Sequence, residues 1–557
     1  MNTVTASVTS SQQGTEQRAP SRPPHPGWFV LARVIGAAGA GVVLYLGFPP
    51  RELWWLAPIA FAGLCAIIWR RSARAGFGYG LVFALTWQLL LLRWLDDFLS
   101  PQFGLAPWLA LSGVCALLVA VPVAGMAVVS SLRGAPVWMA MLFIASEAVR
   151  ARFPLNGFPW SKIAYSQADG VFLPLAAVGG APLVGFAVVL CGAGLALCGR
   201  VLLGERVPLA TGTTRRMSMA GLAAILPILA GVACGPMVTG PSAAEPHTRV
   251  AVLQGNAPDV GVNLGAYDGT VWANHQRRLE EFIGQVRAGE RRRPDMVLLP
   301  ETVAWTRQDD TMRADLAGYA DELGVPLVVG AKTYAPDDTV RNSMLAFVPQ
   351  RGQTAQYDKQ ELVPFSEYVP LRSIASWFTE FLGSTGDLTA GDRPGAFDVA
   401  GTRVGFAICY EVAYDRVARE AVDSGAQLLA VPTNNAWFGR TEMTYQQLAM
   451  SRIRAVEHDR AVVNAATSGV SATVRPDGQV TQQTELFTPA TLVADVPLRS
   501  GVTLSDRLGV LPELALTGGG LVALLIATGG KLRVRVRRRR AGEEDQPDPG
   551  HVGSATI

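Results

Sequence analysis

Apolar runs and mixed sequence occupy two separate regions of the chain. Apolar positions fill residues 29–240 almost without interruption, and another apolar run covers 511–530 before a basic tail. The stretch 248–500 interleaves charged and apolar residues throughout. Because a helix needs about 20 mostly apolar residues to cross a bilayer, the pattern predicts a membrane region in two parts, with a water-exposed domain inserted between them.

Eight membrane-spanning helices are predicted, and basic loops set their orientation. Cytoplasmic loops carry an excess of Lys and Arg, and "RRSAR" (Arg70–Arg74), the loop from Arg200 to Arg216 and the C-terminal tail share one side, although Arg150–Phe153 is an exception. Both termini are therefore expected in the cytoplasm, and the domain at 248–500 on the outer face, the periplasm in a bacterium. The predicted spans are 29–47, 53–69, 76–95, 106–131, 136–150, 178–202, 218–238 and 511–530.

Composition agrees with a membrane protein. Hydrophobic residues make up 49% and charged residues 17% of the 557 residues, and the net charge of +3 says little about partners. Residues 1–28 are rich in Ser, Pro and Gln, so we expect a disordered tail. The basic run Lys531–Arg540, inside the tail at 531–557, directly follows an apolar span. We interpret it as a cytoplasmic stop-transfer cluster rather than a nucleic-acid-binding segment.

Residues 248–500 predict a layered α/β domain. Some expected strands are apolar on both faces and others alternate, which favours mixed sheets in a sandwich. Strands are expected at Arg249–Leu253, Met296–Pro300, Pro326–Gly330, Ser343–Phe347, Arg403–Ile408, Leu428–Pro432 and Ala461–Ala465. Helices are expected at Asn274–Arg287, Thr311–Leu323, Arg416–Ser424 and Thr441–His458.

Three reactive side chains lie where predicted strands end. "MVLLPET" ends near Glu301, "VGFAIC" ends in Cys409, and Lys359 lies on a proline-interrupted loop. Strand ends that face one edge are where α/β proteins place their chemistry. Each residue alone has an ordinary explanation, a solvated charge or a small buried hydrophobe. Cys409 is the only cysteine in this domain, and the nearby Glu411 would oppose formation of its thiolate.

Histidine and metal chemistry are less favoured. His275 and His458 fall in predicted helices without a nearby signature, so a Cys–His dyad stays an open but weaker alternative. No Cys/His cluster has the spacing of metal ligands, and no Walker-type phosphate loop occurs. The sequence therefore predicts no metal site and no cofactor.

The Glu, Lys and Cys stretches, in that order, resemble the nitrilase (carbon–nitrogen hydrolase) superfamily. The resemblance implies a Glu–Lys–Cys triad on an α-β-β-α sandwich. Eight spans around an external domain of this kind look like the apolipoprotein N-acyltransferase family over nearly the whole chain except the tails. The family commonly has Asn-Asp where this chain has Asn434-Asn435, so the role of Asn435 stays open. The other matching stretches are "NGFPWSKIAYSQ" (156–167), "LVPFSEYVPLR" (362–372), "CYE" (409–411) and "TNNAWFG" (433–439).

The resemblance also implies residue roles. Cys409 would be the nucleophile, Glu301 the general base, and Lys359 the cation that stabilises the thiolate and the tetrahedral oxyanion. Two further glutamates would support the triad, and two aromatic residues would shape the acyl and lipid site. The glutamates are Glu367 and Glu411, and the aromatic residues are Tyr410 and Trp437.

The implied reaction is an acyl transfer in two halves. Cys409 would take an acyl group from a phospholipid as a thioester, and the α-amino group of an S-diacylglyceryl cysteine at the N-terminus of an apolipoprotein would then accept it. This would be the last step of lipoprotein maturation in a bacterial cell membrane. The expected partners are the phospholipid donor, the apolipoprotein acceptor and the bilayer, with no nucleic acid.

Two other functions fit parts of the pattern. A membrane-tethered amidase of the nitrilase type would use the same triad with water as the acceptor, but eight spans exceed what a tether needs. A non-catalytic membrane scaffold would not require an intact triad. A transporter is weaker still, because the spans show no inverted repeat.

Overall fold

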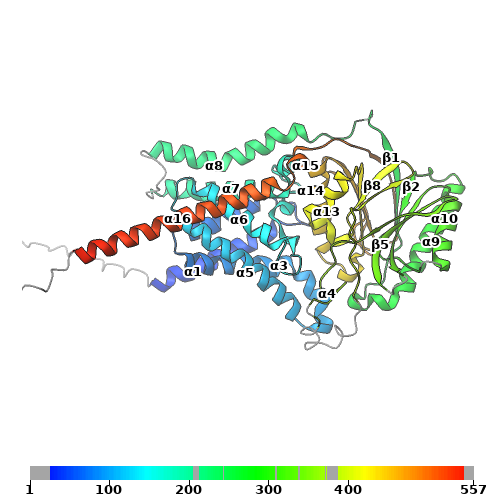
Figure 1. Cartoon of the computed structure of the whole chain (residues 1–557), viewed down its shortest axis with the longest axis horizontal. Helices are drawn as coiled ribbons and strands as arrows, with labels where there is room; N and C mark the ends of the chain where they lie inside the picture. Colours follow the sequence, from blue (N-terminus) through cyan, green and yellow to red (C-terminus); the bar gives the residue numbers. More distant parts are fainter. Residues whose placement is uncertain are drawn as a thin grey trace, which may run out of the picture.

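The computed structural model describes residues 26–204, 213–242, 244–307, 310–335, 339–370, 372 and 387–544. Over these residues the chain forms a helical bundle joined end to end with a layered α/β domain (Figure 1). The first and last described helices, α1 (Pro26–Leu46) and α16 (Leu511–Glu544), both have their outer ends on the side of the bundle away from the α/β domain (Figure 1). Of the predicted tail at 1–28, residues 1–25 lie outside the described residues.

Each of the eight predicted spans coincides with a helix. Within the described part of the chain, five helices are long and apolar enough to cross a membrane, and a sixth span results if the bent pair α3–α4 counts as one. The remaining two, α2 and α6, have 13 and 16 residues and are shorter than a full span. Besides α1 and α16, the bundle contains α2 (Leu56–Ile68), α3 (Ala73–Leu91), α4 (Arg93–Phe103), α5 (Ala106–Val129), α6 (Ala135–Arg150), α7 (Ala176–Leu202) and α8 (Thr213–Cys234).

The third predicted span, 76–95, is wrong at its end. Helix α3 stops at Leu91, and the chain bends by 60° into α4. Leu92 leaves helical geometry, with φ −98° and ψ 16°, and α4 carries the acidic residues Asp96 and Asp97. These charges are unfavourable in hydrocarbon, and α4 instead projects from the bundle beneath the α/β domain (Figure 1).

The α/β domain has four layers. Helices α9 (Asp268–Arg287) and α10 (Thr311–Leu323) cover the first sheet, and α13 (Asp415–Asp423) and α14 (Met443–His458) cover the second, on the side of the bundle (Figure 1). Among the described residues the first sheet has the order β13-β1-β2-β4-β5-β6 with β3 beside β4, and the second has the order β12-β11-β10-β9-β8-β7. Both sheets mix parallel and antiparallel pairs, as predicted. The helix–sheet–sheet–helix sandwich is confirmed.

The strands of the two sheets have the following bounds. The first sheet consists of β1 (His247–Gln254), β2 (Met296–Leu298), β3 (Ala304–Thr306), β4 (Leu327–Tyr334), β5 (Val340–Val348), β6 (Gly352–Asp358) and β13 (Ala490–Pro497). The second consists of β7 (Ala396–Val399), β8 (Thr402–Phe406), β9 (Leu428–Thr433), β10 (Ala461–Ala466), β11 (Ala472–Val474) and β12 (Val480–Gln483). All seven predicted strands are present.

Separate hydrophobic cores hold the layers together. One lies between the two sheets and includes Leu298, Met344 and Phe406. A second lies between the first sheet and α9 with α10. The third is shared, because residues of α14 such as Leu448 and Val456 belong to the same buried cluster as the membrane helices. The α/β domain and the bundle are therefore packed as one body on that side.

Glycines on α7 allow its neighbours to approach closely. A Cβ atom added at Gly194 would lie 2.4 Å from the backbone nitrogen of Ala224 on α8, and one at Gly192 would lie 2.5 Å from the carbonyl oxygen of Pro58 on α2. Small residues of this kind are typical of helix contacts in membranes, where van der Waals packing replaces the hydrophobic effect.

Replacing Gly194 with Val should force α7 and α8 apart. Overpacking of this kind typically costs about 1–3 kcal/mol, so we expect a lower midpoint of thermal unfolding in detergent. Gly199→Val on the same helix is the matched control, since no atom lies within 4 Å of a Cβ added there. Equal midpoints for the two variants would contradict this packing.

Candidate active site

The three side chains predicted to form a triad lie together at strand ends from both sheets. Glu301 follows β2, Lys359 follows β6, and Cys409 begins the short helix η6 (Cys409–Ala413) after β8. The Nζ atom of Lys359 lies 3.0 Å from Oε1 of Glu301, and both charges act on the Cys409 thiol. Segments that are far apart in the sequence therefore converge on one cluster.

Lys359 is a buried cation between two carboxylates. Its side chain is 1% exposed, and its Nζ atom lies 3.0 Å from both Glu301 Oε1 and Glu367 Oε1. Burial by itself would lower the pKa of Lys359, but the attraction of Glu301 and Glu367 outweighs it and raises the pKa well above its ordinary value. Lys359 is therefore held as an ammonium at neutral pH, and it can stabilise an anion.

Hydrogen bonds fix the Glu301 carboxylate. Its Oε1 accepts from the side chain of Asn342 at 2.7 Å as well as from Lys359, and its Oε2 accepts from the backbone N–H of Asn434 at 2.7 Å. Each carboxylate oxygen can accept two hydrogen bonds. Because one donor from the described residues reaches Oε2, that oxygen has a free direction from which to take a proton.

Asn342 on β5 links the two glutamates, and no sequence pattern predicted this role. Its Nδ2 donates to Glu301 Oε1 at 2.7 Å and to Glu367 Oε1 at 2.8 Å. The second oxygen of Glu367 accepts from the backbone N–H of Val363 at 2.8 Å. Glu367 therefore supplies a second negative charge beside Lys359. The Oε2 atom of Glu301 keeps its free direction for a proton. Glu367 thus contacts Lys359, and its role in supporting the triad stays a prediction.

Cys409 lies on a sharp turn between a strand and a helix. Its φ is +53°, in the left-handed region that costs a side chain of this kind of order 1–3 kcal/mol and is found mainly at functional sites. Burial raises the pKa of its thiol to about 12, and the charge of Glu301 adds to the effect, while Lys359 and a hydrogen bond from Thr433 oppose it. Without substrate, Cys409 is therefore a neutral thiol.

Glu411 has a different role from the one its position in the sequence suggests. Its carboxylate accepts from the backbone N–H of Gln360 at 2.6 Å and of Ile408 at 2.7 Å, and from the hydroxyl of Tyr357 at 2.9 Å. Burial raises the pKa of Glu411 to about 7. These bonds tie the turn that carries Cys409 to the loop that carries Lys359. The carboxylate that chiefly opposes ionisation of the thiol is Glu301, not Glu411.

Gln447 on α14 contacts the nucleophile and was missed by the sequence reasoning. Its Nε2 donates to the sulfur of Cys409 at 3.6 Å, and its Oε1 lies 3.1 Å from the hydroxyl oxygen of Thr433. The side chain is 1% exposed. The doublet Gln446-Gln447 in a helix gives no chemical signal by itself, because only the fold brings the N-terminal half of α14 beneath Cys409.

Neither histidine of the earlier alternative contacts the thiol. The ring of His275 bonds to the carbonyl of Val271 at 2.8 Å, and the ring of His458 bonds to Asp506 at 2.6 Å. A Cys–His dyad is therefore excluded. Among the described residues no group of three or more His, Cys, Asp or Glu side chains could hold a metal ion.

The neutral amide of Asn435 makes hydrogen bonds through both its oxygen and its nitrogen. Its Oδ1 accepts from the hydroxyl of Thr433 at 2.6 Å, and its Nδ2 donates to the hydroxyl oxygen of Thr444 at 2.8 Å. Asn435 therefore links Thr433, which bonds to the Cys409 thiol, to the start of α14. An amide satisfies both partners here without a charge.

Aromatic rings lead from Cys409 toward the bundle. Tyr410 donates to the carbonyl of Gly157 at 3.1 Å, and its ring stacks with Phe158 and Trp160 at centroid distances of 5.9 and 6.2 Å. Trp437 packs edge-on against Phe98 of α4 at 6.2 Å. Both aromatic residues predicted to shape a lipid site thus lie at the junction with the bundle.

A buried ion network fastens the α/β domain to this junction. Lys162, in the loop after α6, lies 2.6 Å from Asp415 Oδ2, and Arg454 of α14 lies 2.5 Å from Asp415 Oδ1. Arg454 also donates to the carbonyls of Val412 and Ala413 at the end of the turn that begins with Cys409. The network therefore links the nucleophile turn to the membrane helices.

Comparison with known proteins agrees with this architecture. A family model described as carbon-nitrogen hydrolase matches residues 249–503, and one described as the apolipoprotein N-acyltransferase N-terminal domain matches residues 40–194. Among solved structures, an amidase from Nesterenkonia sp. is 22% identical, with a TM-score of 0.33, covering 48% of this chain and 95% of its own. The fold and the matching models define a membrane-embedded member of the carbon–nitrogen hydrolase (nitrilase) superfamily.

Relatives that match nearly the whole chain identify the family within this superfamily. Apolipoprotein N-acyltransferase of Mycolicibacterium smegmatis is 36% identical over 539 residues, which cover 92% of this chain and 88% of that protein. The enzyme of Ralstonia nicotianae is 33% identical, covering 91% and 94%. The chain belongs to the apolipoprotein N-acyltransferase family.

The pH dependence of alkylation tests the state of the thiol. With a thiol pKa of about 12, the rate at which iodoacetamide modifies Cys409 should rise roughly tenfold per pH unit from about pH 6 to about pH 9, because only the thiolate reacts. Peptide mass spectrometry would separate Cys409 from the cysteines of the bundle. A plateau below about pH 8 would contradict the neutral thiol.

Glu301→Gln should have opposite effects on the two reactions of the sulfur. Loss of the carboxylate charge lowers the thiol pKa, so alkylation at a fixed pH should become faster, whereas acyl transfer should be lost with the proton acceptor. Glu322→Gln is the control, because Glu322 pairs with Arg287 at the surface. Slower alkylation of Glu301→Gln would show that Glu301 does not oppose ionisation.

Proposed function

We propose that the chain transfers an acyl group from a phospholipid to the α-amino group of the S-diacylglyceryl cysteine at the N-terminus of apolipoproteins, through a thioester on Cys409. The observation that carries the proposal is the cluster of Cys409, Lys359 and Glu301 at the junction of a hydrolase-type sandwich with membrane helices. Membership of the apolipoprotein N-acyltransferase family supports acyl transfer over hydrolysis of a C–N substrate or a scaffold role.

In the first half-reaction, Cys409 attacks the ester carbonyl of the phospholipid. Glu301 accepts the thiol proton as the S–C bond forms, since a preformed thiolate is disfavoured by burial. Lys359 stabilises the negative charge on the tetrahedral oxyanion. The C–O bond then breaks, Glu301 returns the proton to the leaving oxygen, and lysophospholipid departs.

In the second half-reaction, the neutral α-amine of the acceptor attacks the thioester carbonyl. Glu301 accepts a proton from the amine as the N–C bond forms, and Lys359 again stabilises the oxyanion. The C–S bond breaks, the sulfur recovers the proton from Glu301, and the amide product leaves with Cys409 as a thiol. Glu301 thus acts as base and acid in each half.

The membrane placement follows from the substrates. Both are lipids, and each buried methylene contributes about 0.8 kcal/mol of anchoring, so a site that had to extract long acyl chains would be very slow. We propose eight crossings within residues 29–240 and 511–530, with both termini in the cytoplasm and the domain at 248–500 on the outer face. Tyr410 and Trp437 would line the path of the acyl chain beside Cys409.

Intact-protein mass spectrometry tests the thioester. Enzyme incubated with phospholipid and no acceptor should gain the mass of one acyl group on Cys409, and hydroxylamine should remove it. Cys409→Ala and Cys409→Ser should gain no thioester, and Lys359→Ala should lose about 100- to 1,000-fold in rate. A wild-type thioester that water removes as fast as an added diacylglyceryl peptide would instead indicate a hydrolase.

Gln447 should assist the sulfur in both half-reactions. Gln447→Leu removes the donor 3.6 Å from Sγ, and loss of a hydrogen bond to a charged group costs roughly 1.5–3 kcal/mol. We expect a rate loss of about 10- to 100-fold and slower alkylation of Cys409. Gln482→Leu is the control, because Gln482 is an exposed residue of the edge strand β12. Unchanged alkylation in Gln447→Leu would exclude this role.

A further inference from the structure

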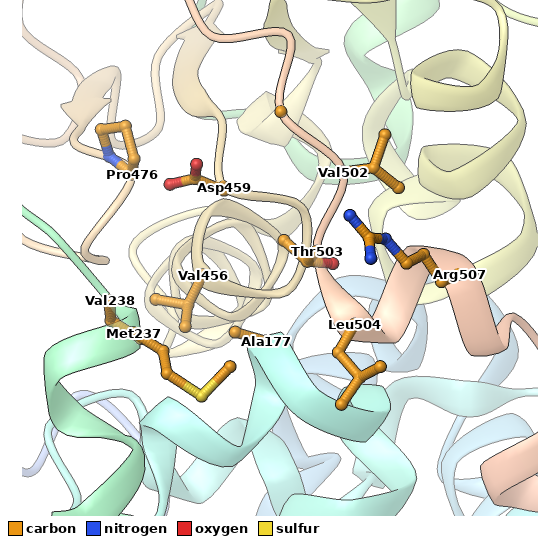
Figure 2. A pocket seen from close by; sticks show the side chains of 11 residues that line it. Ala177, Met237, Val238, Val456, Asp459, Pro476, Val502, Thr503, Leu504 and Arg507 are labelled. Atoms are coloured by element: carbon orange, nitrogen blue, oxygen red, sulfur yellow. The ribbon is translucent and has the colours of Figure 1, made fainter.

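A cavity lies at the far end of α14 from the nucleophile. Its volume is about 420 Å³, and Ala177 of α7 and Val456 of α14 belong to its lining (Figure 2). Val456 follows Gln447, the residue that contacts Cys409, by nine positions, which corresponds to about 13 Å along a helix. No residue of the triad lines this cavity, so it is separate from the site already described.

The cavity lies where three membrane helices meet the α/β domain. Ala177 is in the first turn of α7, Met237 follows the end of α8, and Leu504 lies on α15 (Leu504–Leu508), which directly precedes α16. Residues just outside the ends of membrane helices lie at the level of the lipid headgroups. The cavity therefore opens at the headgroup region on the side of the catalytic domain.

Its mouth is apolar. Met237 is 53% exposed, Val502 54% and Leu504 41%. The apolar surface continues onto the start of α16, where Leu511 and Leu514 are also exposed. Because the flanking elements are the ends of α8 and α16, the molecules that cover this surface are lipids of the bilayer.

Arg507 is the one cation among the residues that line the cavity. Arg507 is exposed, and within the described ranges its guanidinium has no hydrogen-bond or ion-pair partner. Figure 2 shows it turned toward the other lining residues, with Asp459 on the opposite side. The charge of Asp459 is balanced by an ion pair with Arg499, so Arg507 is left to bind an external anion. A guanidinium is suited to the oxygens of a phosphate.

We propose that this cavity is a second lipid site, which binds the phosphate of a bilayer phospholipid through Arg507. The upper part of an acyl chain lies over Met237, Val502 and Leu504. The bound lipid fixes the base of the catalytic domain against the membrane surface at a point remote from Cys409. The site goes beyond the proposed acyl transfer, because no group in it reaches the reacting atoms.

Site-specific photo-crosslinking tests this assignment. A photoreactive amino acid is placed at Leu504, or at Leu525, which is exposed in the middle part of α16 and serves as the bulk-lipid control. The full-length protein is reconstituted in nanodiscs of phosphatidylethanolamine and phosphatidylglycerol that contain a minor fraction of diacylglycerol. Mass spectrometry then gives the ratio of phospholipid to diacylglycerol adducts at each position.

The ratio at position 504 should exceed that at 525 by at least about fivefold, as expected when a charge-assisted contact to phosphate exists in one lipid and not in the other. Arg507→Ala should lower the ratio at 504 to that at 525, and Arg507→Lys should retain most of it. Arg277→Ala, on the water-facing surface of α9, should change neither ratio.

Equal ratios at 504 and 525 in the wild-type protein would overturn the proposal, and so would an unchanged ratio in Arg507→Ala. The adducts at 525 report whether each variant is folded and inserted. Because acylation of Cys409 is measured separately on the intact protein, loss of the second lipid site and failure of the proposed acyl transfer give different results.

Discussion

A buried ammonium between two carboxylates organises the active site. An uncompensated charge in the interior destabilises a fold by about 3–5 kcal/mol, so Lys359 requires both Glu301 and Glu367 within contact distance. That requirement brings the ends of β2 and β6 and the following loop to one point. Asn342 then sets the two carboxylates side by side. The geometry that compensates the buried ammonium is the same geometry that leaves Glu301 able to take a proton.

The neutral thiol changes the usual picture of a cysteine nucleophile. An enzyme with a Cys–His pair holds a thiolate ready, whereas Cys409 stays protonated because burial and Glu301 outweigh Lys359. Deprotonation is therefore coupled to attack on a carbonyl group that has reached the site. A protonated, largely buried sulfur also reacts slowly with oxidants and chance electrophiles. The donor from Gln447 stabilises negative charge on the sulfur as that charge forms.

Local patterns in the sequence predicted much of this fold and part of the site. Apolar runs located the eight helices, and β-branched runs located the central strands, because those elements are buried and their periodicity is strong. Shorter or more polar edge strands such as β12 were missed, since they have little apolar pattern to detect. The bend after Leu91 was missed because it depends on where α4 packs. Glu301, Lys359 and Cys409 stood out by chemistry, whereas Asn342 and Gln447 are ordinary residues until the fold brings them there.

The shared core between α14 and the membrane helices has a mechanical consequence. Arg454, Asp415 and Lys162 connect the nucleophile turn to the loop after α6 through buried charges. A hinge between the two parts would break this network and open apolar surface on both sides. Swinging the sandwich away from the bundle would therefore cost both the buried ion pairs and the shared apolar core. The helices of the bundle thus form a fixed support for the turn that carries Cys409.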